Sequence, residues 1–187
     1  MFVALDLPEL VRKDIMAWSE RELTGPAMRP VRPESLHVTL AFLGNRPLSE
    51  VERIEEAMYE IAETPILLQL QSPVGRPGRD RPRLIALPVD SNPVVARQRE
   101  LAETLVYEGL YKPEGRTFWP HVTVARVRAE GRGSRHPMQA KIPSGPSPTA
   151  RIGYFDAVRI SLYRSELQPS GAHYVPLAQV ELPGRGW

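Results

Sequence analysis

The sequence contains one five-residue pattern twice, HVTLA at residues 37–41 and HVTVA at residues 121–125. The two copies differ at one position, and their histidines lie 84 residues apart. Each copy is rich in aliphatic and β-branched residues and follows a loop that contains proline, which is typical of a β-strand. The repeat predicts a chain of two similar lobes, each with one such strand.

Side chains alternate between the two faces of a strand. His37 and Thr39 therefore share one face while Val38 takes the other, and His121 and Thr123 share a face in the second copy. A lone histidine on a strand is most often structural, but a structural role leaves the repetition of both His and Thr unexplained. With the valines in the core, the pattern predicts a polar cleft of near-twofold symmetry between the lobes.

This set of groups suits attack at a phosphodiester. Hydrolysis takes a proton from the attacking water and delivers one to the departing oxygen on the other side of phosphorus. A neutral histidine can act as base and a protonated one as acid, because the imidazole pKa lies near 6.5. Hydroxyl groups can donate to the non-bridging oxygens, where charge accumulates. The pattern predicts His37 and His121 as catalytic residues and Thr39 and Thr123 as phosphate-binding residues, with no metal and no cofactor.

The rest of the chain reads as a mixture of strands and helices. Strands are expected at residues 2–7, 35–43, 66–70, 84–89, 116–127, 154–162 and 172–180, and an exposed loop at 131–149. The 66–70 and 84–89 strands are expected to form a long hairpin, and the last two strands a closing pair. Because strands and helices do not alternate strictly, this order favours an α+β fold.

Three helices are expected between these strands. Apolar residues at helical spacing give each helix one buried face: Val11, Ile15 and Trp18; then Val51, Ile54, Met58 and Ile61; then Val94, Leu101 and Leu105. The first helix begins after Pro8. The second begins at a capping box of Ser49 and Glu52 and runs until Pro65. The third takes Asn92 as its N-terminal cap, with a proline at its first helical position.

Length and composition restrict the class of protein. The 187 residues can bury the core of a single domain spanning 1–187, and the absence of cysteine excludes disulfides, thiol nucleophiles and thiolate zinc sites. No uncharged apolar run approaches the roughly 20 residues that cross a bilayer. The start lacks a basic residue and holds Asp6, unlike a secretory signal. We therefore expect a cytoplasmic protein.

Arginine makes up nearly all of the positive charge. Lys and Arg total 24 against 22 acidic residues, and three of the 24 are lysine. Guanidinium groups suit phosphate and stacked bases, although biased genomic base composition produces the same excess. Two local clusters can face phosphates or simply be solvated loops: Arg76, Arg79, Arg81 and Arg83, and Arg126, Arg128, Arg132 and Arg135.

The paired H-x-T motifs resemble those of the 2H phosphoesterase superfamily. Their flanks, LHVTLAFLG and FWPHVTVAR, look like its RNA 2',3'-cyclic phosphodiesterase branch of the LigT or ThpR type, whose older name is 2'-5' RNA ligase. FVALDLP at 2–8 and SLYRSELQPSGAHYVPL at 161–177 are similar as well. The resemblance covers nearly the whole chain.

The resemblance implies a bilobal α+β fold whose antiparallel sheets line a central cleft, with helices outside. It also implies hydrolysis of a terminal RNA 2',3'-cyclic phosphate to a 2'-phosphate, with O3' as the leaving atom. By analogy His37 is the acid and His121 the base, although the near symmetry leaves the reverse order open. An RNA 5'-hydroxyl in place of water would form a 2'-5' linkage without ATP.

The resemblance implies three further candidate site residues. Arg126 occupies the position of a phosphate-binding arginine. It lies five residues after His121, so a regular strand would turn it away unless the strand ends, bulges or lets the side chain curl back. Phe2 is a candidate contact for a base, with core packing as the alternative. Arg32 is a candidate RNA contact in a segment that lacks the aromatic residue often found there.

Other functions remain open beside this one. The chain is expected to act as a monomer on RNA with a 2',3'-cyclic phosphate end, without a membrane partner. One alternative is an RNA-end-binding module without turnover, and another is the same chemistry on a small cyclic nucleotide. An ATP-dependent ligase is disfavoured because the K-x-D-G-like segment at Lys112 reads as a turn. Steep salt dependence would favour RNA over a small substrate.

Overall fold

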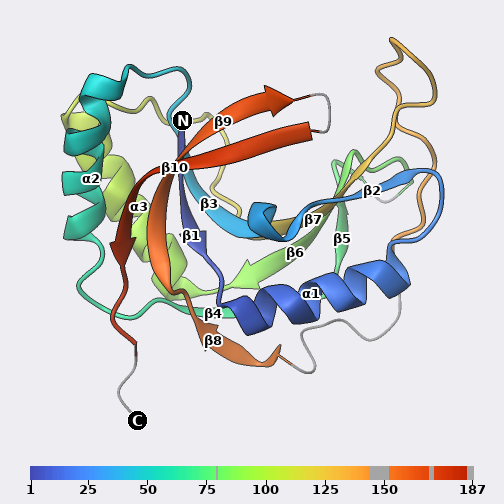
Figure 1. The fold of residues 1–187 in the computed structure, drawn as a ribbon, viewed down its shortest axis with the longest axis horizontal. Helices are drawn as coiled ribbons and strands as arrows, with labels where there is room; N and C mark the ends of the chain where they lie inside the picture. The colour runs from blue at the N-terminus through green and yellow to red at the C-terminus, as the bar shows by residue number, and fades with distance from the viewer. Residues whose placement is uncertain (79, 144–151, 169–170, 185–187) are drawn as a thin grey trace.

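The computed structural model describes residues 1–78, 80–143, 152–168 and 171–184. It is an α+β fold, as the sequence predicts (Figure 1). The helical elements are α1 (Glu9–Glu22), η1 (Pro33–Ser35), η2 (Leu48–Glu50), α2 (Val51–Glu60) and α3 (Asn92–Tyr107). The strands are β1 (Phe2–Asp6), β2 (Met28–Pro30), β3 (His37–Phe42), β4 (Leu67–Leu70), β5 (Val74–Arg76), β6 (Leu84–Asp90), β7 (His121–Val127), β8 (Tyr154–Asp156), β9 (Arg159–Gln168) and β10 (Gly171–Glu181).

The strands pair antiparallel in the order β10-β9-β1-β3-β7-β6-β4-β8, with β2 added to β7 and β5 added to β6. The two repeat strands, β3 and β7, are neighbours at the centre of this order. They pair with each other at Val38 and Val122, the middle residues of the two H-x-T triplets. The repeats therefore meet where the two halves of the sheet join.

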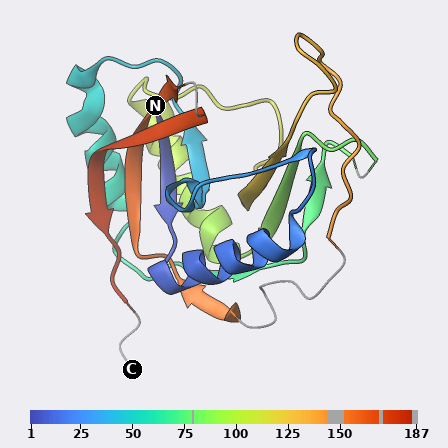
Figure 2. The ribbon, with the colours of Figure 1, turned by 45° about the vertical axis from the view of Figure 1, so that its right-hand side comes forward.

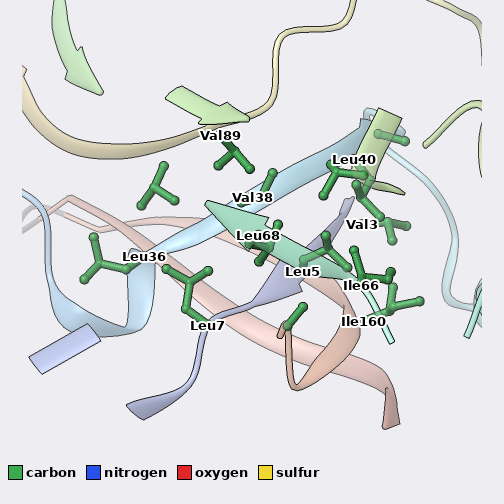
Figure 3. Close-up of a cluster of buried hydrophobic side chains, with 14 of the residues drawn as sticks. Val3, Leu5, Leu7, Leu36, Val38, Leu40, Ile66, Leu68, Val89 and Ile160 are labelled. Atoms are coloured by element: carbon green, nitrogen blue, oxygen red, sulfur yellow. The ribbon is translucent and has the colours of Figure 1, made fainter. Parts of the chain in front are cut away.

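The helices bury apolar faces against the strands. Figures 1 and 2 show α2 and α3 side by side and α1 running separately along the lower edge. Figure 3 shows residues of β1, β3 and β4 packed together, among them Val3, Leu5, Val38 and Leu68. The expected face of α1 is confirmed by buried Val11, Ile15 and Trp18, that of α2 by Ile54 and Met58, and that of α3 by Val94, Leu101 and Leu105.

Two helix starts differ from the sequence prediction. Ser49 does not cap α2, because a 3₁₀ turn begins directly after Pro47 and contains Ser49. The cap of α3 is Ser91 rather than Asn92: its Oγ accepts a hydrogen bond from the Val94 amide at 3.1 Å and donates one to the Leu67 carbonyl at 2.6 Å. The buried serine therefore both starts α3 and ties it to β4.

Three strand predictions also change. The predicted strand at 116–127 begins only at His121. The predicted hairpin is confirmed by the β4–β6 pairing, but its connection contains β5, which also pairs with β6. The segment 154–162 divides, because β8 pairs with β4 while β9 pairs with β1 and β10. Of the expected loop at 131–149, residues 144–149 lie outside the described part.

A helix that crosses a bilayer must be both long and apolar. Among the residues that the structure describes, no helix is both long enough and apolar enough to cross a bilayer.

The assignment of the α3 cap can be tested by stability. Ser91→Ala removes two hydrogen bonds of a buried hydroxyl, so we expect a loss of about 1–3 kcal/mol in the free energy of unfolding. Asn92→Ala changes an exposed neighbour and should cost less than about 0.5 kcal/mol. Urea denaturation of both variants measures the difference. Equal losses would contradict the assignment of Ser91 as the cap.

Candidate active site

The first repeat strand, β3, contains a bulge directly after its H-x-T triplet. Its pairing with β1 passes from Thr39 opposite Ala4 to Ala41 opposite Val3, so Leu40 is the extra residue. Leu40 and Ala41 are both buried, at 2% and 3% exposure. Two successive side chains therefore face the core, and the alternation shifts by one residue beyond them.

The second repeat strand, β7, is bulged at the equivalent residue. Its pairing with β6 passes from Thr123 opposite Ala86 to Ala125 opposite Ile85, which makes Val124 the extra residue. Val124 and Ala125 are both buried. The burial pattern along HVTVAR is the same as along HVTLAF in β3.

The bulge determines where Arg126 points. In a regular strand Arg126 would lie on the face opposite His121, but the extra residue returns it to the face of His121 and Thr123. Arg126 is exposed, and within the described residues it has no carboxylate partner. The sequence allowed the strand to end, to bulge or to let the Arg126 side chain curl back, and the structure has the bulge. By the same shift, Phe42 lies on the face of His37.

His37 lies in a cluster of aromatic rings. Its ring centroid is 5.0 Å from that of Phe2, 5.4 Å from Tyr174 and 6.1 Å from Tyr163. Phe2 is only 4% exposed and packs on these rings, which favours the core-packing alternative for that residue. The most exposed aromatic side chain of this cluster is Phe42, which is 56% exposed and whose ring centroid lies 6.0 Å from that of Phe2.

Burial controls the protonation of His37. Burial, and after it the positive charge that His121 can carry, together lower the pKa of this imidazole from 6.5 to about 4. The buried Nδ1 has no hydrogen-bond partner among the described residues. The neutral ring therefore has its proton on Nε2, because a proton on Nδ1 would be an unpaired buried donor.

His121 is held in the opposite tautomer. Its ring stacks on Trp119 with centroids 4.1 Å apart and planes inclined by 16°. Its Nδ1 lies 2.8 Å from the Trp119 carbonyl, which can only accept, so Nδ1 donates and Nε2 keeps its lone pair. Burial lowers the pKa of His121, the Trp119 carbonyl opposes this, and the charges of Arg76 and Arg116 lower it again.

A buried carboxylate supports the His37 side of the site. Asp6 is paired opposite His37 between β1 and β3. Its carboxylate accepts hydrogen bonds of 2.8 Å from the hydroxyls of Ser161 and Tyr163, and it forms an ion pair with Arg159, with Nε 3.0 Å from Oδ2. Burial and Asp6 raise the pKa of Tyr163 to about 12. This network fixes the ring that packs beside His37. The sequence analysis gave its residues no role in the site, although Asp6, Ser161 and Tyr163 lie in the stretches at 2–8 and 161–177 that share the family resemblance.

The two threonines are half-buried on the histidine face, and within the described chain their hydroxyls are engaged in no hydrogen bond. Both can therefore donate to an anion placed between the strands. Arg32 is exposed and 4.0 Å from Glu34, in the connection from β2 to η1. No group of three or more His, Cys, Asp or Glu side chains in the described part of the chain is placed to hold a metal ion.

The members of the two arginine clusters make different contacts. Arg81 pairs with Glu130, and Arg83 donates to the Arg135 carbonyl, so these members join the two loops. Arg76 instead lies over the Trp119 ring, with Cζ 4.3 Å from the centroid. Arg79 lies outside the described residues.

Solved structures of known proteins share this fold. TT0787 of Thermus thermophilus has a TM-score of 0.78 at 26% identity, over 99% of this chain and 98% of that one. The Escherichia coli LigT structure complexed with 3'-AMP has a TM-score of 0.70 at 24% identity, over 97% and 96% of the two chains. Together with the paired H-x-T strands, this fold defines a 2H phosphoesterase.

Sequence comparison identifies the family. The model of LigT-like phosphoesterases matches residues 5–84. The RNA 2',3'-cyclic phosphodiesterase of Archaeoglobus fulgidus is 30% identical over 97% of this chain and 99% of its own length. That of Methanocaldococcus jannaschii is 27% identical over 93% and 95%. The chain belongs to the LigT-like phosphoesterase family of enzymes.

The tautomers and pKa values can be read by NMR. We expect His37 to titrate near pH 4 with its neutral proton on Nε2, and His121 to titrate below 6.5 with its proton on Nδ1. His121→Ala should raise the pKa of His37, because a like charge is removed. Long-range ¹H–¹⁵N spectra across a pH series measure this, with His136→Ala as the exposed control. A His37 that titrates at 6.5 would contradict the burial argument.

Proposed function

We propose that this enzyme hydrolyses the 2',3'-cyclic phosphate at an RNA end to a 2'-phosphate, with His37 and His121 as its acid and base. The observation that carries this proposal is the pair of complementary imidazoles on one face of adjacent strands. One presents an N–H donor at Nε2 and the other a lone pair. The names of the curated relatives support the choice of a cyclic phosphate on RNA.

In the proposed reaction, His121 Nε2 takes a proton from water as the water oxygen bonds to phosphorus. The P–O3' bond breaks on the opposite side, and His37 donates a proton to O3'. The P–O2' bond remains, so the product is a 2'-phosphate with a free 3'-hydroxyl. Thr39 and Thr123 donate hydrogen bonds to the non-bridging oxygens as their charge grows.

The low pKa of His37 in the free protein fits this role once substrate binds. A phosphate beside the imidazole supplies a negative charge and an acceptor, both of which favour the protonated ring. Arg126 supplies a fixed positive charge on the same face for the phosphate. His37 is therefore expected to gain its proton together with the substrate.

We propose 2'-5' RNA ligation as a second reaction of the same site. When an RNA 5'-hydroxyl replaces water, the same displacement of O3' forms the linkage and needs no ATP, because the cyclic ester contains the leaving group. Both histidines and both threonines come from one chain, so we propose that a monomer is sufficient for either reaction.

The reaction is tested with a short RNA that ends in a 2',3'-cyclic phosphate, in the presence of EDTA, with ³¹P NMR to identify the product. We expect the 2'-phosphate at full rate, and losses of roughly 10²–10⁴-fold in His37→Ala and in His121→Ala. His136→Ala is the matched control.

A 3'-phosphate would reverse the leaving oxygen, and a loss of activity restored by a divalent metal would contradict the metal-free scheme. Binding without product would favour the RNA-end-binding module.

The pH profile tests the two-histidine scheme separately. The active free enzyme carries one proton on the pair, and this form disappears above the higher of two pKa values that both lie below 6.5. We expect kcat/KM to fall tenfold per pH unit above about pH 6.5 and to bend down again near pH 4, with apparent values that belong to the pair. The kcat profile should lie at higher pH, because bound phosphate raises both pKa values. A kcat/KM that stays flat from about pH 5 to 8 would exclude the scheme.

A further inference from the structure

The two repeats differ at one pair of equivalent positions. The residue that the bulge returns to the histidine face is Phe42 in β3 and Arg126 in β7. In the β3 half, Phe42 is opposite Phe2, which in turn is opposite Tyr163. The β3 half of the sheet therefore carries three aromatic side chains in a line across the strands. We call Phe42, Phe2 and Tyr163 the aromatic row.

The β7 half carries a basic row at the equivalent level. Arg126 is opposite Arg29 of β2 on one side and Leu84 of β6 on the other, and Leu84 is opposite Arg76 of β5. Directly opposed residues share a face. The backbones of Arg29 and Arg76 lie about 5 and 10 Å from that of Arg126, at the usual spacing of strands. We call Arg29, Arg126 and Arg76 the arginine row.

The charges of Arg76 and Arg126 are not explained by internal ion pairs. Neither has a carboxylate partner in the part of the chain that the structure describes. Arginines elsewhere do have such partners, as in the pairs Arg53–Glu108 and Arg99–Glu103. Instead Arg76 is held over Trp119, the ring that stacks on His121, and its charge lowers the His121 pKa.

The aromatic row and the arginine row lie at opposite ends of the histidine pair. Each row is at the C-terminal end of its repeat strand, and β3 and β7 run antiparallel through Val38 and Val122. In a ribose with a 2',3'-cyclic phosphate, the base leaves from C1' and the rest of the strand from C4', on opposite sides of the cyclic ester. An RNA end therefore needs a stacking surface and a phosphate-binding surface at opposite ends of the site.

From this match we propose that the arginine row binds the phosphodiesters upstream of the cyclic end. The substrate is then an oligonucleotide with at least two upstream phosphates, and a free cyclic mononucleotide lacks these contacts. The terminal base lies toward exposed Phe42. The inference rests on the proposed function and specifies the length and polarity of its substrate.

The test compares kcat/KM for a 2',3'-cyclic mononucleotide without a 5'-phosphate and for a trinucleotide with the same cyclic end. We expect the trinucleotide to be preferred by the wild type. Arg29→Gln and Arg76→Gln should each reduce the ratio of the two values roughly tenfold. Using the ratio cancels any effect of Arg76 on His121 itself. Arg99→Gln, an exposed arginine on α3, should keep the wild-type ratio.

Two further measurements identify charge as the cause. A trinucleotide with neutral methylphosphonate upstream linkages keeps its bases but should lose the preference. The salt dependence of log kcat/KM for the ordinary trinucleotide should become shallower by about 0.7 for each arginine removed.

A ratio near one in the wild type, or unchanged ratios in both variants, would overturn the arginine row as a binding site while leaving the cyclic phosphodiesterase in place. Failure to hydrolyse either substrate would overturn the proposed function instead. Arg29 and Arg76 lie on different strands, so if one of the two variants does not fold, the ratio of the other variant alone decides.

Discussion

One backbone constraint organises the site: each repeat strand has an extra residue directly after its H-x-T triplet. Leu40 and Val124 each join the following alanine in the core, and this reverses the alternation of side chains. Without the bulge, His and Thr would still share a face, but the residue three beyond the threonine would be buried against the core. With it, each strand presents three candidate site positions on one surface while its aliphatic residues stay buried.

The same scaffold gives its two histidines different surroundings. His37 is packed among aromatic rings that Asp6, Ser161 and Tyr163 hold in place, so its charged form is costly. His121 is flanked by an indole ring and bonded to a backbone carbonyl that keeps one tautomer. A sequence repeat that looks symmetric therefore produces a donor on one strand and an acceptor on the other. The difference comes from neighbouring strands and loops, not from the repeat.

Sequence reasoning could not predict those features of the site that depend on neighbouring strands and loops. Periodicity predicted the repeat strands, the apolar helix faces and the histidine–threonine face, because these depend on residues adjacent along the chain. It placed the α3 cap one residue late, since the choice of Ser91 depends on the Leu67 carbonyl of a distant strand. It also missed Tyr163 and Tyr174, which reach His37 through the pairing of β9 and β10 with β1. For Arg126 the sequence left three possibilities open: the strand ends, it bulges, or the side chain curls back. Only the pairing register between strands decides among them.

The proposed direction of the chemistry rests on the tautomers. The pairing of Val38 with Val122 places the backbone of His37 toward the Arg126 end of the sheet, but its ring packs beside Phe2. Arg76 of the arginine row lies instead over the Trp119 ring that stacks on His121. The two ends of the sheet therefore do not assign the acid and the base. The assignment comes from the ring nitrogens: the unpartnered Nδ1 of His37 places its neutral proton on Nε2, and the Trp119 carbonyl leaves Nε2 of His121 free to accept, which supports the proposal of His37 as acid and His121 as base.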